Sequence, residues 1–139
     1  MAKRIFEAGI LFALGGLFYL LIELLWRGYS HWTMFFLGGT CFLLLGLINE
    51  FYDFSIPLVL QMFFGAVIIT ALEFIAGYIL NIRMGLEVWD YSALPLNILG
   101  QISLPYMILW FFLSAACIIT DDWLRYALFD EERPHYKIV

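Results

Sequence analysis

Apolar residues in this chain come in long continuous runs rather than in the alternating pattern of a half-buried strand. Four runs are long enough to cross the hydrocarbon core of a bilayer as helices, and they cover residues 5–26, 32–49, 56–80 and 101–120. Such a crossing of roughly 30 Å takes about 20 residues. Only helices and closed barrels satisfy the backbone in lipid, and uninterrupted runs favour helices. The pattern predicts an all-α integral membrane bundle of four transmembrane helices, with residues 1–139 as a single domain.

The composition agrees with this class. Of 139 residues, 64% are hydrophobic and 14% charged, whereas soluble domains have roughly 45–50% apolar and about 25% charged residues. The net charge of −5 argues against a nucleic-acid partner, because phosphate binding needs a basic surface. Acids concentrate after the last run, which we interpret as a solvated end: Asp121, Asp122, Asp130, Glu131 and Glu132.

The distribution of basic residues predicts the orientation. If the N-terminus is cytoplasmic, the outer side holds only Arg27 and Arg83. The inner side collects Lys3, Arg4, Arg125, Arg133 and Lys137. This bias predicts that both termini are cytoplasmic. Residues 81–100 then form an outer loop, and residues 121–139 form a cytoplasmic tail with a short amphipathic helix.

The outer loop at 81–100 is longer than the usual connection between helices, so we expect it to be structured or functional. Asp90 and Ser92 form an Asp-x-Ser element typical of a side-chain-to-backbone turn, and Asn97 offers the same chemistry. Trp89 marks the membrane interface. These side chains either form turns or make up the polar edge of a lid. We expect the loop itself to lie on the bilayer surface or to dip into it.

Glu73 lies inside the third apolar run, roughly 10 Å below its outer end at 1.5 Å per residue. A carboxylate at that depth is costly unless it is protonated, paired or hydrated, so it marks a candidate functional site. The alternative is that Glu73 neutralises an arginine and locks two helices together.

Glu23 lies near the outer end of the first run, with Arg27 at the favourable i+4 position for a helical ion pair. Glu23 and Glu73 approach the same layer, with Arg27 and Arg83 just above. This predicts a polar pocket that binds a zwitterionic or cationic headgroup or carries protons. The same groups can equally form a closed ion-pair network that contributes only stability.

Other chemistry finds little support in the sequence. The two histidines, His31 and His135, fall on opposite membrane sides, and no metal-binding motif surrounds either. The chain has no GxxxxGK[ST] phosphate loop and no GxSxG nucleophile motif. We therefore expect no metal, no cofactor and no enzymatic activity.

The second half of the chain resembles a known family. Its pattern is Glu73, Trp89-Asp90-Tyr91-Ser92, Pro95, Asn97, Gly100 and Ile102. This resembles the CmpB-like family of ABC-transporter type IV membrane proteins, most closely over residues 70–105. Tyr19, Glu23 and Arg27-Gly28 are similar to the family's first helix. The family then has a longer Gly/Pro-rich stretch with a Pro-x-Tyr-Gly element, where this chain has YSHWTMFFLGG.

The resemblance implies a multi-pass protein of the bacterial plasma membrane with a transport role. A separate ATPase or another membrane subunit would then be its partner, since this chain lacks a nucleotide site. Two alternatives remain open: a homodimeric proton-coupled small exporter, and a structural or regulatory membrane protein without transport activity.

Overall fold

The computed structural model describes residues 1–52 and 54–139, and its helices follow the four apolar runs. They are α1 (Ala2–Arg27), α2 (Thr33–Tyr52), α3 (Leu58–Gly77) and α4 (Leu104–Phe129). A π-helix, η1 (Tyr78–Arg83), continues α3. All four helices, with η1 counted as part of α3, are long and apolar enough to cross a membrane. Over the described ranges there is no strand, only an isolated bridge between Ile98 and Ile102. The prediction of an all-helical protein with four membrane-length helices is confirmed.

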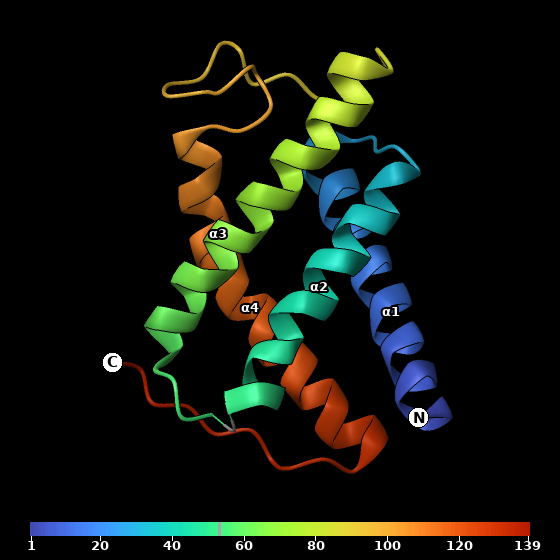
Figure 1. Ribbon diagram of the computed structural model, residues 1–139, viewed down its shortest axis with the longest axis vertical. Coiled ribbons are helices and arrows are strands. Elements are labelled where there is room, and N and C mark those ends of the chain that lie inside the picture. Colours follow the sequence, from blue (N-terminus) through green and yellow to red (C-terminus); the bar gives the residue numbers. More distant parts are fainter. Residues whose placement is uncertain (53) are drawn as a thin grey trace.

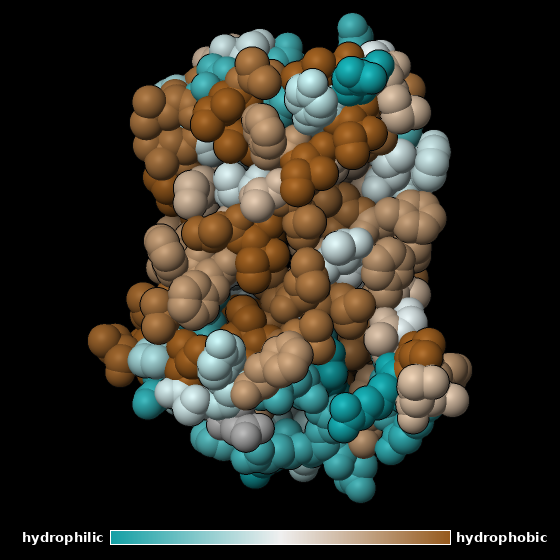
Figure 2. Space-filling model, in the orientation of Figure 1, coloured by the Kyte–Doolittle hydropathy of each residue, from teal (hydrophilic) through white to brown (hydrophobic). Residues whose placement is uncertain are grey.

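The helices run up and down, so both termini lie at the same end of the bundle (Figure 1). We call this the terminal end, and the opposite end, which carries residues 84–103, the loop end. α1 packs against α2, α3 packs against α4, and α2 also contacts α3 and α4. A broad apolar belt covers the middle of the molecule, and hydrophilic residues gather at the terminal end (Figure 2).

Glycines allow α1 and α2 to approach closely. Gly38 of α2 lies against the side chain of Tyr19, and Gly15 of α1 lies against Phe42. A methyl group at either position would overlap the facing ring. In lipid, such close packing stabilises helix pairs because the hydrophobic effect between them is absent.

Local signals set several helix ends. Gly28 ends α1 in the left-handed region, with φ 79°, and its N–H donates to the Leu24 carbonyl at 3.0 Å. The Ser103 hydroxyl accepts from the Tyr106 N–H at 3.4 Å and caps α4, with Pro105 in the first turn. Other bounds differ from the predictions: η1 ends three residues beyond the predicted end at 80, and α4 continues well past 120.

The predicted separate amphipathic helix in the tail is wrong, because α4 continues without interruption to Phe129. Residues 130–139 form no helix and run beneath the terminal end toward the start of α3 (Figure 1). There the carbonyls of Lys137 and Ile138 accept from the N–H groups of Leu58 and Val59, at 2.7 and 3.1 Å. The C-terminal segment thus satisfies donors that the first turn of a helix cannot satisfy internally.

The acids after residue 120 also differ from the prediction of a solvated end. Asp130 and Glu132 are exposed, but Asp121 is 0% and Asp122 3% exposed. The reason is the close approach of α4 to α2, where Gly46 has no side chain and the Asp121 carboxyl occupies the space. Helical periodicity places these two acids in the interior as α4 continues.

Candidate functional site: an apolar cavity with a buried carboxylate

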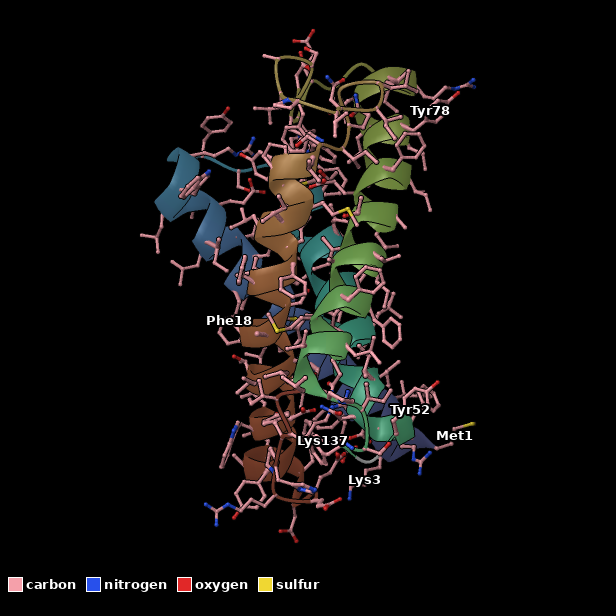
Figure 3. All side chains as sticks on the ribbon, turned by 90° about the vertical axis from the view of Figure 1, so that its left-hand side faces the viewer. Met1, Lys3, Phe18, Tyr52, Tyr78 and Lys137 are labelled. Atoms are coloured by element: carbon pink, nitrogen blue, oxygen red, sulfur yellow. The ribbon has the colours of Figure 1, made fainter. Side chains whose placement is uncertain are left out.

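The membrane-spanning region contains a cavity of about 330 Å³. α1 packs mainly on α2, and the cavity lies where α1 and α4 diverge. Its wall comes from all four helices and includes Phe18 and Ile22 of α1, Cys41 of α2, Glu73 of α3, and Trp110, Leu113 and Ala116 of α4. Phe18, at mid-height in Figure 3, and Ile22 are also exposed on the bundle surface. The cavity is therefore a groove that opens sideways, toward the hydrocarbon in a bilayer.

Among the described residues that line this groove, Glu73 has the one carboxyl group. Its side chain is 3% exposed, and it accepts two hydrogen bonds. The Tyr91 hydroxyl donates to Oε2 at 3.2 Å, and the Trp110 indole N–H donates to Oε1 at 3.4 Å. Among the described residues Glu73 forms no ion pair, so the alternative that it neutralises an arginine is not supported. Each carboxyl oxygen keeps a lone pair for a further donor.

Tyr91 connects the loop to the groove. Its ring stacks on Tyr106 of α4 with centroids 4.3 Å apart, which holds the hydroxyl over Glu73. Burial, reinforced by the nearby Glu73 carboxyl, raises the pKa of Tyr91, so its hydroxyl stays protonated and remains a donor. The loop thus contributes a hydrogen-bond donor to Glu73 through Tyr91, which was not among the predicted site residues.

Glu23 and Arg27 form a pair that is separate from this groove. Arg27 Nη2 lies 2.6 Å from Glu23 Oε2, so the predicted i,i+4 ion pair is confirmed. Ser30 donates to the other Glu23 oxygen at 3.2 Å, and Arg27 Nη1 donates to the Val88 carbonyl at 3.1 Å. The pair ties the end of α1 to the loop. Neither residue lines the groove, so the predicted common pocket of two acids and two arginines does not form.

The loop residues that the sequence predicted for the site form hydrogen bonds within the loop itself. Asp90 accepts from the Ser92 N–H at 2.9 Å, as the turn interpretation predicted, and this hydrogen bond lowers the pKa of Asp90. Asn97 donates to the carbonyls of Ser92 and Leu94 and accepts from the Gly100 N–H. These polar groups lie at the edge of the loop and do not contact Glu73.

Trp89 and Arg83 also lie outside the predicted pocket. Trp89 is buried with Met34 and Val88 beneath the loop, and its indole N–H donates to the Gln101 carbonyl at 3.0 Å. Arg83, at the end of η1, is exposed. Of the predicted site residues, the structure therefore leaves Glu73 alone at the groove.

Sequence reasoning missed both donors to Glu73. Tyr91 was part of the quoted Trp-Asp-Tyr-Ser motif. Trp110 lies near the middle of the predicted apolar run 101–120, whereas membrane tryptophans concentrate at the two interfaces. A mid-span tryptophan was therefore a signal that its N–H has a buried partner.

The sequence comparisons place the chain in a family. Residues 10–126, which include Glu73, Tyr91 and Trp110, match the family described as "Putative ABC-transporter type IV". The chain belongs to this family. No curated protein and no solved structure matches the chain. The family assignment agrees with four membrane-length helices and places the groove within the part of the chain that the family shares.

Proposed function

We propose that the protein is the membrane-embedded component of a transport system and that it binds an amphiphilic substrate in the groove between α1 and α4. The observation that carries this proposal is the combination of a laterally open apolar cavity with one buried carboxylate, Glu73. The cavity wall matches an apolar substrate body, since ligand sites are mostly apolar with few placed polar groups. Glu73 provides the polar contact for a positively charged or hydrogen-bond-donating head.

The loop supports this assignment. Tyr91 fixes one Glu73 oxygen from the loop end, and Trp110 fixes the other from α4. The carboxylate is therefore held in one orientation before a ligand arrives, which reduces the entropic cost of binding. Since Tyr91 belongs to the loop, a displacement of the loop would release Glu73. The loop acts in this proposal as a lid on the substrate group.

The family membership supports coupling to a separate ATPase. The sequence has no phosphate-binding loop, so ATP hydrolysis would occur on a partner subunit. We place both termini in the cytoplasm of a bacterial plasma membrane, on the basis of the Lys and Arg distribution, and we assign the chain no enzymatic step. A cysteine introduced at Ala93 in the loop tests the orientation. An impermeant maleimide added to intact cells should label it.

A diazirine-bearing alkylamine tests the groove directly in the purified protein in nanodiscs. Photolysis should give adducts on groove residues, mapped by mass spectrometry, and the uncharged alcohol of equal chain length should give several-fold fewer. Ala116→Trp fills the groove and should abolish the adducts, whereas Ala127→Trp, on an exposed part of the same helix, should not. Glu73→Gln should remove the preference for the amine. Equal labelling by both probes, or unchanged labelling in Ala116→Trp, refutes the proposal.

A proton-coupled homodimeric exporter is the second candidate, favoured by the absence of an ion-pair partner for Glu73 among the described residues. A buried carboxyl group of this kind can exchange a proton with a substrate cation. Liposomes containing this protein alone separate the two candidates. Export of an amphiphilic amine driven by a pH gradient, without ATP and lost in Glu73→Gln, supports the exporter. A requirement for ATP and a second subunit supports the first proposal.

A further inference from the structure

A second pocket, which is polar, lies at the terminal end of the bundle, away from Glu73 and the loop end. Its volume is about 230 Å³. The ends of α2 and α4, Phe54 of the α2–α3 connection and the C-terminal segment form its wall. The wall residues are Asn49, Glu50, Phe54, Asp122, Arg125, Glu131 and Glu132. Nothing in the proposed function uses this pocket, and the inference below does not depend on that function.

The pocket has more negative than positive charge. Among the described residues, Arg125 is the one basic residue of the wall, and its one close ion pair is with Asp121, at 2.7 Å. The same guanidinium lies 3.7 Å from Glu50 and 4.0 Å from Glu131, which are loose contacts. Asp122 receives only neutral donors, from Asn49 at 2.6 Å and from the Tyr136 hydroxyl at 2.8 Å. Among the described residues of the pocket wall, one guanidinium therefore faces four carboxyl groups, those of Glu50, Asp122, Glu131 and Glu132.

The pKa of Glu131 is shifted in the direction expected for a buried carboxyl group. Burial raises the pKa of Glu131 to about 7, and a hydrogen bond with Glu50 adds to the shift. Glu7 of α1 contributes further negative charge, while Arg125 acts in the opposite direction. The ionised form of this carboxyl group would thus be stabilised by an additional cation.

Asn49 gives a second, independent observation. The residue is 3% exposed and lines the pocket. Its amide N–H₂ donates to Asp122, but its Oδ1 has no donor among the described residues. Buried polar atoms in proteins nearly always have a partner. The unpaired Oδ1 is an acceptor that a ligand bringing N–H or O–H donors can satisfy.

The pocket wall suits an organic cation. In the described part of the chain, no group of three or more acidic, histidine or cysteine side chains converges closely enough to hold a metal. The Phe54 ring adds an apolar wall, which suits methylene groups. A primary ammonium has three N–H donors that can point in different directions. We propose that this pocket binds a primary alkylammonium group, with its donors directed to Asn49 Oδ1 and to the carboxylates of Glu50 and Glu131.

Thermal unfolding of the full chain in nanodiscs tests the site with ethylammonium as the probe. Tetramethylammonium at equal ionic strength is the control, since it carries the same charge without N–H donors. Ethylammonium should raise Tm saturably, because a ligand that binds only the folded state stabilises it. Tetramethylammonium should have no saturable effect. Equal responses to the two cations would overturn the proposal.

Two variants locate the binding. Glu50→Gln and Glu131→Gln each remove one charged acceptor and should weaken ethylammonium binding by about tenfold or more. Either variant suffices if the other does not fold. Glu87→Gln, in the exposed part of the loop, is the matched control and should bind as the parent does. Unchanged affinity in both pocket variants would also overturn the proposal.

The same titration with N-acetyl-lysinamide distinguishes two sources of the ammonium group. Tighter binding than ethylammonium identifies the ligand as a lysine side chain of a partner protein. Equal or weaker binding identifies it as a free small amine. Absence of saturable binding by either compound refutes the site.

Discussion

The buried ion pair of α4 gives the most decisive test of the structure. Asp121 Oδ2 lies 2.7 Å from Arg125 Nε, and the two side chains are 0% and 9% exposed. The substitution Arg125→Met keeps most of the side-chain length and removes the charge. It leaves Asp121 in the interior without its cation, and it also deprives Glu50 and Glu131 of their nearest positive charge.

The expected cost follows from burial. Removing one partner of a buried ion pair destabilises a protein by about 3–5 kcal/mol, because an uncompensated charge remains inside. If these residues belonged to a solvated tail, the loss would be about 0–1 kcal/mol. Lys3 and Glu7 supply the matched control, since they form an i,i+4 pair at 3.7 Å with Lys3 80% exposed. Lys3→Met should cost about 0–1 kcal/mol.

Equilibrium unfolding in mixed detergent, followed by tryptophan fluorescence at increasing dodecyl sulfate fraction, measures these differences. Asp121→Asn and the double variant complete a thermodynamic cycle, with an expected coupling energy of about 1–3 kcal/mol. Asp121→Asn alone should cost less than Arg125→Met, because Arg125 retains Glu50 and Glu131 as neighbours. A cost for Arg125→Met no larger than that of Lys3→Met would refute the burial of this pair.

Further predictions concern the loop and the terminal end. Gly77→Ala should lower the free energy of unfolding by about 1–3 kcal/mol. The added methyl group would lie 2.6 Å from the Gln101 amide oxygen and 2.9 Å from the Trp89 ring. Gly9→Ala, with no neighbour within 4 Å, should be neutral or stabilising in the same unfolding assay. Trp89→Phe leaves the Gln101 carbonyl without its donor and should cost about 1–3 kcal/mol, with faster proteolysis within residues 84–103 as the readout. The pKa of Glu131 is raised from 4.5 to about 7. Between these pH values the folded state therefore holds more protons than the unfolded state, and the contribution of Glu131 to stability falls as the pH rises. Glu131→Gln should therefore flatten the decrease in Tm between these pH values relative to the parent, and an unchanged slope would contradict the assignment.

Much of the fold was predictable because lipid leaves the backbone few choices. A continuous apolar run must satisfy its own hydrogen bonds, so its length alone predicts a helix. Contacts between near neighbours were predictable for the same local reason. The Glu23–Arg27 pair and the Asp90–Ser92 turn depend on spacings of four and two residues, which secondary structure fixes directly.

The site was only partly predictable. The depth of Glu73 in its run marked it as unusual, but its partners come from positions 18 and 37 residues away. Arg27 contacts Val88 across 61 residues. Asp121 and Asp122 looked like a solvated end because the last run seemed to finish at residue 120. In the structure α4 continues to Phe129, and its periodicity turns both acids inward.

The sequence by itself determined the membrane class, the four helices and their local caps, since these depend on run length, spacing and residue type. Only the tertiary structure decided which polar groups meet. Helices that are apolar on most faces carry little information about their own rotation, because lipid and protein interior are equally apolar solvents for them. Rotation and crossing instead follow from close contacts such as Gly38 with Tyr19 and Gly46 with Asp121. Those contacts bring α2 against α1 and against α4, and the second of them leaves the Asp121 carboxyl inside the bundle beside Arg125.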